Sequence, residues 1–372
     1  MTDTYGTDGP STRCVKAASA QAIPGQPVAA FPITASAYHL SADETAELDT
    51  YGRGSNPTWR QLESALAQLE GATAALVFGS GMAAITAALR ALTAPGATLV
   101  VPADGYYQVR AYATEYLARQ GVNVVQAASG EMIDAAGHAD VVLAETPANP
   151  SLDVVDLHRL GMACRARNAR LIVDNTAATP LGQQPLSLGA DLVVASATKA
   201  LSGHSDLLCG YVAGSHPEVV DAIARERLLS GPVLGAFDAW LVLRSLGSAG
   251  LRFERQCENA GALAAMLDSH PAVAGVRYPG LPGDPAYPVA TAQMRRFGGL
   301  VSAELADAAA THEFVERSEL LVASTSFGGI HTSVDRRARW GDDVKAGFVR
   351  ISAGIEDTDD LVADVERALH GL

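Results

Sequence analysis

Cysteine, basic residues and long apolar runs are all scarce in this chain. Its four cysteines, Cys14, Cys164, Cys209 and Cys257, are too scattered to indicate a disulfide framework or a zinc site. The histidines are not paired at metal-ligand spacing, so we expect no metal. No run approaches about 18 consecutive apolar residues, and the N-terminus lacks the pattern of a signal peptide. We therefore expect a cytoplasmic protein that has no membrane partner.

Basic residues are outnumbered, with 27 Lys and Arg against 41 Asp and Glu and a formal net charge of −14. A nucleic-acid partner requires a basic surface, so this balance argues against one. Hydrophobic residues make up 48% of the chain, which is too many for a disordered protein. At 372 residues we expect two or three domains.

The order of apolar segments predicts the architecture. Residues 1–50 are rich in Pro, Ser, Thr and Ala without periodicity, and we interpret them as an N-terminal arm. Short β-branched runs then alternate with helical segments, which is typical of a mostly parallel, doubly wound α/β sheet over residues 51–235. A smaller α+β domain is expected over residues 236–372. The predicted strands of the first domain are Ala74–Phe78, Thr98–Val101, Val122–Val125, Val141–Ala144, Arg170–Val173, Leu192–Ala195 and Gly210–Val212.

A lysine follows one of these predicted strands. Lys199 comes shortly after Leu192–Ala195, with the hydroxyls of Ser196 and Thr198 close by. Ligands bind at the carboxyl ends of strands in doubly wound sheets. A partly desolvated lysine there has a lowered pKa, which suits Schiff-base chemistry with an aldehyde. The alternative is an ordinary surface lysine in a βα loop.

Two other strand ends complement the lysine. Asp174 directly follows the predicted strand Arg170–Val173. A carboxylate there needs a cationic partner, such as the pyridinium nitrogen of pyridoxal phosphate. The alternative is that Asp174 caps the next helix. The turn Gly79–Ala84 could hold a phosphate at a helix N-terminus. The same turn also matches a dinucleotide fingerprint, with Asp104 about 20 residues on. Ser196-x-x-Lys199 matches a serine acylase pattern, but the companion motifs are missing.

Six blocks together resemble the Cys/Met-metabolism family of pyridoxal-phosphate enzymes, which includes cystathionine γ-synthases, cystathionine lyases and methionine γ-lyases. The resemblance runs from about residue 12 to the C-terminus, and it implies the fold-type-I α/β architecture of PLP-dependent transferases. The blocks are Tyr51–Thr58, Leu69–Ala72 with Ser80–Ala84, Glu145–Pro150, Asp174–Thr176, Ser196–Lys199 with Gly203–Asp206, and Arg350–Asp357.

The resemblance implies a role for each matching residue. Lys199 would form the Schiff base with pyridoxal phosphate and move protons, and Tyr106 would stack on the ring and act as acid or base. The other cofactor-binding residues would be Asp174 at the pyridine nitrogen, Asn149 near the phenolic oxygen, Gly81, Met82, Ser196 and Thr198 at the phosphate, and Tyr51 and Arg53 at the neighbouring subunit's phosphate. That sharing implies a dimer, and we expect a homotetramer. Arg350 and Ser326 would bind the α-carboxylate of a small amino-acid substrate.

Three departures from the family bear on the substrate. Gln108 replaces the cysteine that methionine-specialised members often carry, and the segment after Tyr106 is bulkier and one residue shorter. His331 stands where many members have a glutamate that recognises a distal amino group, and the absence of that glutamate argues against a preference for cystathionine. We include His331 among the substrate-binding residues. The loop Asp335–Asp343 replaces the family's usual segment, and we interpret it as a solvated charged loop, with a lid over the distal pocket as the alternative.

The leading hypothesis is a lyase that eliminates the γ substituent of a sulfur amino acid, giving a 2-oxo acid, ammonia and a thiol. Within the family the alternatives are γ-replacement on an activated homoserine, as in cystathionine γ-synthase, and methionine γ-elimination. From other classes, a nicotinamide-dependent dehydrogenase and a non-catalytic protein that holds pyridoxal phosphate stay open.

Overall fold

The computed structural model describes residues 8–19, 22–25, 27–43 and 49–372. Its larger sheet has seven strands in the order β1-β7-β6-β5-β4-β2-β3, and every apolar run predicted as a strand forms one. All run in the same direction except β7, which is antiparallel to β1 and β6. The fold is therefore the mostly parallel sheet expected. The strands are β1 (Ala74–Phe78), β2 (Thr98–Pro102), β3 (Asn123–Ala127), β4 (Val141–Glu145), β5 (Arg170–Asp174), β6 (Leu192–Ser196) and β7 (Gly210–Gly214).

Helices cover both faces of this sheet, because the side chains of its strands alternate between two buried cores. Leu76, Phe78 and Leu99 point to the face covered by α3, α4 and α8. The opposite face packs against α2, α5, α6 and α9. These helices are α2 (Pro57–Glu70), α3 (Gly81–Leu92), α4 (Tyr107–Tyr112), α5 (Met132–Ala136), α6 (Leu157–Arg167), α8 (Pro217–Ser230) and α9 (Ala236–Leu246).

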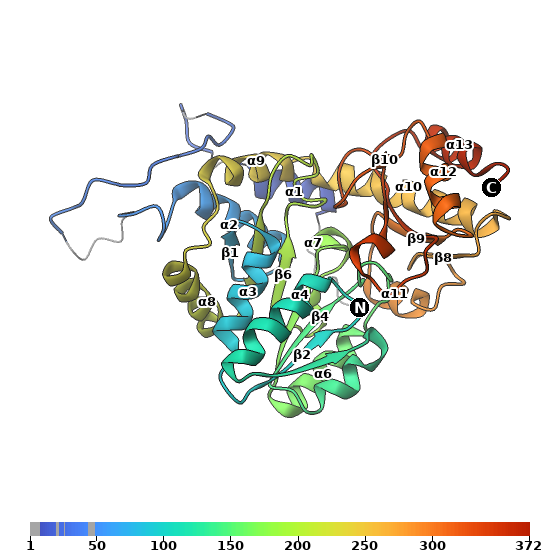
Figure 1. Ribbon diagram of the computed structural model, residues 1–372. Coiled ribbons are helices and arrows are strands. Elements are labelled where there is room, and N and C mark those ends of the chain that lie inside the picture. Colours follow the sequence, from blue (N-terminus) through green and yellow to red (C-terminus); the bar gives the residue numbers. More distant parts are fainter. Residues whose placement is uncertain (1–7, 20–21, 26, 44–48) are drawn as a thin grey trace.

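A second sheet of five strands follows, in the order β10-β11-β12-β9-β8. Two successive helices, α9 and the long α10 (Ala249–Ser269), lead into this sheet. Figure 1 shows this sheet beside the larger one, in orange and red. Its strands are β8 (Gly275–Arg277), β9 (Leu300–Glu304), β10 (Val322–Ala323), β11 (Ser333–Arg336) and β12 (Phe348–Ser352), and the remaining helices are α7 (Thr179–Gly182), α11 (Tyr287–Gln293), α12 (Ala308–Arg317) and α13 (Thr358–Leu369).

The N-terminal segment contains one helix that the sequence analysis did not anticipate. Helix α1 (Pro10–Ala18) buries Cys14 and Ala17 in the core between α2, α9 and α10. The described residues after it run away from the body in Figure 1 (blue), and Ala37 pairs with Tyr51 in an isolated bridge. The domain boundaries at 50 and 235 stay predictions. No helix in the described part of the chain is both long and apolar enough to cross a membrane.

Candidate active site

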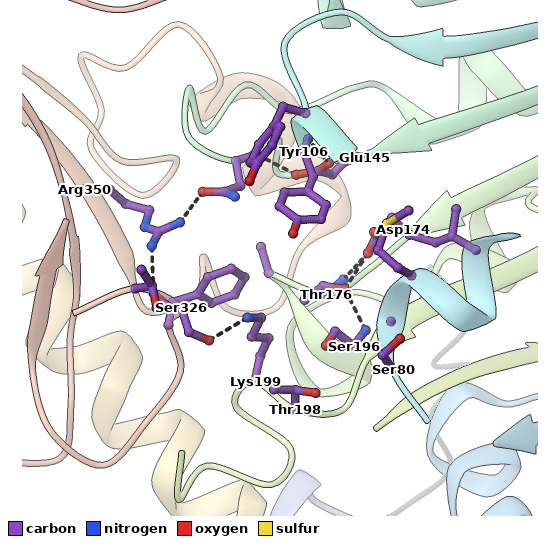
Figure 2. Close-up of a pocket in the computed structure, with 18 of the residues that line it drawn as sticks. Ser80, Tyr106, Glu145, Asp174, Thr176, Ser196, Thr198, Lys199, Ser326 and Arg350 are labelled. Carbon is purple, nitrogen blue, oxygen red and sulfur yellow. Dashed lines mark hydrogen bonds between the residues drawn. The ribbon is translucent and has the colours of Figure 1, made fainter. Parts of the chain in front are cut away.

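A cavity of about 420 Å³ opens at the carboxyl ends of the parallel strands. One wall comes from strand ends of the larger sheet and the other from β12 and the loops beside it (Figure 2). Ten of the residues expected at the site line this cavity: Gly81, Met82, Tyr106, Asn149, Asp174, Ser196, Thr198, Lys199, Ser326 and Arg350. The structure therefore brings together residues that are spread over about 270 positions of the sequence.

Lys199 extends into the cavity from the turn after β6. Its Nζ donates a hydrogen bond of 2.5 Å to Ser326 Oγ and lies 4.9 Å from the ring centre of Phe327. Burial, reinforced by the positive charge of Arg350, lowers the pKa of Lys199 to about 8, although Asp174 acts in the opposite direction. An amine with this pKa is half neutral at about pH 8, and the neutral form is the one that attacks a carbonyl group.

Asp174 is buried at the end of β5 and is oriented by Thr176. Both the backbone N–H of Thr176, at 3.0 Å, and its hydroxyl, at 2.5 Å, donate to the same carboxylate oxygen, Oδ1. Burial raises the pKa of Asp174, and the hydrogen bonds from Thr176 oppose that rise. These bonds leave Oδ2 available for a cation in the cavity. A protonated pyridine nitrogen fits this position, because it is cationic and planar.

The start of helix α3 forms the opposite end of the cavity. Ser80 caps the helix by accepting a hydrogen bond from the Ala83 N–H at 3.1 Å, and the amides of Gly81 and Met82 belong to its first turn. A Cβ atom on Gly81 would lie 2.8 Å from Ser196 Cβ, so only glycine fits there. The first-turn amides and the Ser196 hydroxyl are hydrogen-bond donors of the kind that bind a phosphate dianion. The dipole of the helix also attracts the negative charge of the phosphate. The Thr198 hydroxyl bonds to the backbone of Cys209, at 3.2 Å to its carbonyl and 2.9 Å from its N–H.

Glu145 is a cavity residue to which the sequence analysis gave no role. One carboxylate oxygen accepts from the Tyr106 N–H and the other from the Asn149 N–H, each at 2.7 Å. Burial, and then the neighbouring charge of Asp174, raise the pKa of Glu145 to about 8. Glu145 therefore fixes the backbone of two residues expected to touch the cofactor. Its place directly after the apolar run Val141–Ala144, which matches the place of Asp174 after Arg170–Val173, was the sequence signal that could have revealed it.

Arg350 enters the cavity from β12 and is 2% exposed. Its Nη1 donates to Asn149 Oδ1 and its Nη2 to the Ser326 carbonyl, both at 2.7 Å. Among the described residues, no group accepts a hydrogen bond from its Nε. Burial, followed by the charge of Arg337, lowers the pKa of Arg350 to about 10, so it stays cationic at neutral pH. A buried guanidinium with a free donor is a suitable site for a carboxylate.

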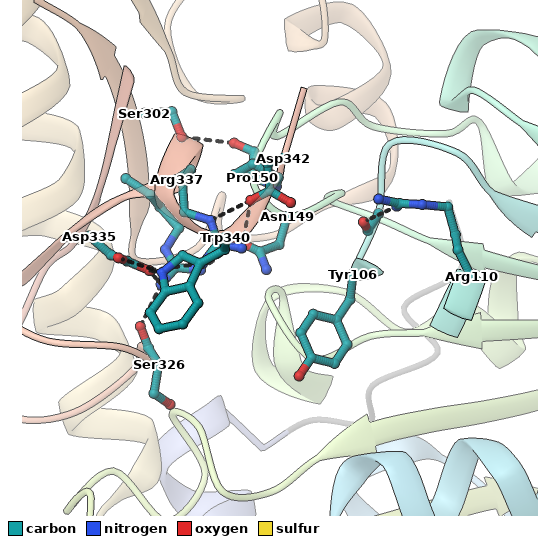
Figure 3. A network of polar contacts seen from close by, with 12 residues as sticks. Tyr106, Arg110, Asn149, Pro150, Ser302, Ser326, Asp335, Arg337, Trp340 and Asp342 are labelled. Carbon is teal, nitrogen blue, oxygen red and sulfur yellow. Dashed lines mark hydrogen bonds and ion pairs between the residues drawn. The ribbon is translucent and has the colours of Figure 1, made fainter. Parts of the chain in front are cut away.

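The loop Asp335–Asp343 is only partly the solvated charged loop that we expected, because Arg339 and Asp343 are exposed whereas two of its charged residues are buried. Asp335 and Arg337 are only 5% and 6% exposed, because Arg337 pairs with Asp335 at 2.8 Å and with Asp342 at 2.7 Å (Figure 3). Mutual neutralisation allows these charges to be buried. Arg337 and Trp340 line the cavity. The loop therefore contributes to the cavity wall, and its role as a lid over the distal pocket stays a prediction.

Three predicted residues do not line the cavity. Tyr51 is 53% exposed, with the Arg53 guanidinium 5.4 Å from its ring centre, and both lie outside the cavity of their own chain. His331 is exposed and also lies outside the lining. Within the described residues, no cluster of three or more His, Cys, Asp or Glu side chains could hold a metal ion.

Fold and site together define a pyridoxal-phosphate enzyme, and comparison with known families agrees. The model of the Cys/Met metabolism PLP-dependent enzymes matches residues 11–370, so the chain belongs to this family. It is accordingly a PLP-dependent enzyme of the trans-sulfuration group, as the resemblance implied. The site fits the cofactor, since it offers a lysine, a buried aspartate and a phosphate cradle. The dehydrogenase alternative is thereby excluded, and Asp104 lies outside the cavity with its Oδ2 bonded to the Ser129 N–H at 2.9 Å.

The relatives carry several reaction names. A Streptomyces coelicolor protein provisionally named cystathionine gamma-lyase is 44% identical over 99% of this chain and 97% of its own. The cystathionine gamma-synthase of Mycobacterium tuberculosis is 36% identical over 98% of this chain and 97% of its own. A crystal structure of CalE6, titled a methionine gamma lyase from Micromonospora echinospora, superposes with a TM-score of 0.91 at 36% identity, covering 97% and 99% of the two chains.

Proposed function

We propose that this protein catalyses γ-elimination on a sulfur amino acid, releasing a 2-oxo acid, ammonia and a thiol. The observation that carries the proposal is the position of Lys199, whose Nζ lies in the cavity that Arg350 also lines, with a lowered pKa. Elimination requires a base that removes protons from two adjacent carbons of a substrate held by its carboxylate. Lys199 and Arg350 supply these two functions.

Pyridoxal phosphate, when bound, supplies an aldehyde that condenses with amines and a ring that withdraws electrons from the bound amino acid. In the proposal, Asp174 Oδ2 holds the ring nitrogen in its cationic form. The Gly81 and Met82 amides and the Ser196 hydroxyl bind the phosphate, and the Thr198 hydroxyl does so by turning its proton away from the Cys209 carbonyl. Asn149 Oδ1 accepts a hydrogen bond from Arg350 Nη1, and its Nδ2, which has no partner among the described residues, donates to the phenolic oxygen.

Lys199 then acts at its Nζ as the base that takes protons from the substrate's α and β carbons. Ser326 Oγ, which accepts from Nζ at 2.5 Å, keeps the amine on the Arg350 side of the cavity. Tyr106 lines the opposite wall, and burial raises the pKa of its phenol, so the hydroxyl keeps its proton. Tyr106 can therefore donate that proton to the departing thiolate.

Two substrates distinguish elimination from replacement. Purified holoenzyme given cystathionine alone should release 2-oxobutyrate, ammonia and cysteine. Given O-succinylhomoserine or O-acetylhomoserine with a thiol, it should form more oxo acid than thioether. Failure to produce an oxo acid from cystathionine, methionine or homocysteine, together with efficient thioether formation, would show γ-replacement instead. Such a result would favour the reaction named for the mycobacterial relative.

The lysine assignment has its own test. The holoenzyme should show the visible absorption band of a lysine Schiff base. Lys199→Ala should lack this band, and its kcat should be lower by at least about 10³-fold. Lys345→Ala is the control, because Lys345 is exposed and its side chain pairs with the carboxylate of Glu304, away from the cavity lining. Persistence of the band in Lys199→Ala would place the Schiff base on another lysine.

We also propose that the protein is a homotetramer made of two dimers. Within each dimer, Tyr51 and Arg53 of one subunit reach the cofactor phosphate of the other. Support comes from the exposed apolar side chains of Val28, Phe31, Leu40, Leu229 and Phe237, which are unfavourable in water. Lys199→Ala and Arg53→Ala subunits, mixed and reassociated, should regain activity, because each hybrid dimer then has one intact site. Absence of complementation would indicate that Arg53 serves its own chain. We keep the cytoplasmic setting as part of this proposal.

A further inference from the structure

The cavity wall contains a buried charge network that the reaction described above does not use. Asp335 on β11 lies directly opposite Arg350 on β12 in the antiparallel ladder. Its Oδ2 is 3.6 Å from Arg350 Nη2, which is too long for a hydrogen bond, although both side chains are almost fully buried. A buried carboxylate beside a buried guanidinium ordinarily forms a close bidentate pair. Something holds this pair apart.

Arg337 and Trp340 occupy the acceptor positions of Asp335. Arg337 Nη1 donates to Asp335 Oδ2 at 2.8 Å, and Trp340 Nε1 lies 3.0 Å from Oδ1 and 3.2 Å from Oδ2 (Figure 3). Arg337 is fixed in turn, because its Nε and Nη2 are both 2.7 Å from Asp342 Oδ2. The carboxylate of Asp335 is therefore directed toward the loop, and its ion pair with Arg350 stays at 3.6 Å without a hydrogen bond.

We propose that Arg337 is a positioning residue which, with Trp340, keeps Asp335 from forming a close hydrogen-bonded pair with Arg350 and so preserves the Arg350 N–H groups for the substrate's α-carboxylate. The inference rests on the proposed function, in which Arg350 binds that carboxylate. Without Arg337, Asp335 is free to turn onto Arg350. An external carboxylate would then compete with an internal one that is always present, and binding would weaken.

The remaining N–H groups of Arg350 agree with this role. Nη1 and Nη2 each donate one N–H, to Asn149 and Ser326, which fixes the plane of the guanidinium. Each of these nitrogens carries a second N–H, to which no hydrogen-bond partner is found among the described residues, so a substrate carboxylate can bind there. Asp335, whose Oδ2 is 3.6 Å from Nη2, would compete for the same donors if the network were released.

The experiment measures binding by the holoenzyme of two non-reacting ligands, L-norleucine and L-norleucinamide, by calorimetry. Only norleucine has a carboxylate. Arg337→Met should weaken norleucine binding about tenfold and leave norleucinamide within about twofold. Adding Asp335→Asn to Arg337→Met removes the competing charge and should restore norleucine binding. Trp340→Phe, which keeps a ring but loses the N–H, should give a smaller loss in the same direction.

Several outcomes would overturn the inference. Equal weakening of both ligands in Arg337→Met would indicate general damage to the site, and a double variant as weak as the single one would exclude competition by Asp335. Lys345→Met, which removes an exposed cation from the same half of the chain, should match the wild type. If the wild type itself bound norleucine no better than norleucinamide, the role of Arg350 in the proposed function would fail as well. The two failures are therefore distinguishable.

Discussion

Lys199 and Ser326 are 127 residues apart in the sequence, yet the lysine Nζ donates a 2.5 Å hydrogen bond to the serine Oγ. Ser326 has a φ of 75°, a left-handed conformation that is unfavourable for residues other than glycine. Its carbonyl also accepts from Arg350 at 2.7 Å. One strained residue thus contacts both the expected base and the expected carboxylate-binding group, as strained residues at active sites often do.

Replacements of Ser326 should separate stability from activity. Ser326→Gly removes the strain and should raise the free energy of unfolding by up to about 1 kcal/mol, whereas Ser326→Ala keeps the Cβ atom and should not. Both lose the hydroxyl, so both should lower kcat/KM. Chemical denaturation and steady-state kinetics measure the two effects. A stability gain in Ser326→Ala equal to that in Ser326→Gly would contradict the role of strain.

The lowered pKa of Lys199, about 8, sets the pH dependence of cofactor uptake. Only the neutral amine attacks the aldehyde, and its fraction rises with pH until the pKa is passed. The initial rate at which cofactor-free protein gains visible absorbance should therefore rise with pH and level off above about pH 8. Arg350→Met should move the profile to higher pH, because the Arg350 charge contributes to the lowering of the Lys199 pKa. A rate still rising near pH 10.5, where free lysine titrates, would contradict this.

Replacement of Thr176, which orients Asp174, should weaken cofactor binding. Its hydroxyl donates to Asp174 Oδ1 and accepts from the Ser196 N–H at 2.9 Å. Thr176→Val preserves shape but leaves both partners short of one hydrogen bond. We expect a loss of about 1–3 kcal/mol in the free energy of unfolding and about tenfold weaker cofactor binding. Thr176→Ser, which keeps the hydroxyl, should be close to wild type, and fluorescence titration with the cofactor measures the difference.

Glu145→Gln tests whether this carboxylate positions the wall of the cavity. An amide nitrogen cannot accept a hydrogen bond, so either the Tyr106 N–H or the Asn149 N–H loses its partner. The free energy of unfolding of Glu145→Gln should be about 1–3 kcal/mol lower than that of the wild type, and its kcat should be reduced. Asp104→Asn, which alters the carboxylate that accepts from Ser129, is the matched control. Equal kcat values for Glu145→Gln and wild type would exclude the positioning role.

The sequence revealed most of the fold because its strands are short, continuous apolar runs. It did not reveal the direction of β7, since Gly210–Gly214 has the same composition whether it runs parallel or antiparallel to β6. Helix α1 was missed for a different reason. Its nine residues lie in a segment rich in Pro, Ser and Thr, and the helix is defined by packing on α2 and α10 rather than by a long periodic pattern.

The residues at strand ends were predictable, and the charged loop was not. Lys199 and Asp174 follow recognisable strands, so their meeting follows from the rule that parallel strands end at one edge. Arg337 lies in the sequence Arg-Arg-Ala-Arg-Trp, where nothing distinguishes it from Arg339, which is exposed and lies over Trp340. Only the three-dimensional placement of Asp335 and Asp342 on either side of Arg337 makes it a buried residue.

The cavity draws one wall from each sheet, with Lys199 after β6 and Arg350 on β12. Any ligand that contacts both residues binds only when both halves of the chain are folded. By mass action, such a ligand stabilises the two halves together. Thermal unfolding should consequently become more cooperative as the concentration of a carboxylate ligand is raised, with the melting of both sheets converging on one temperature.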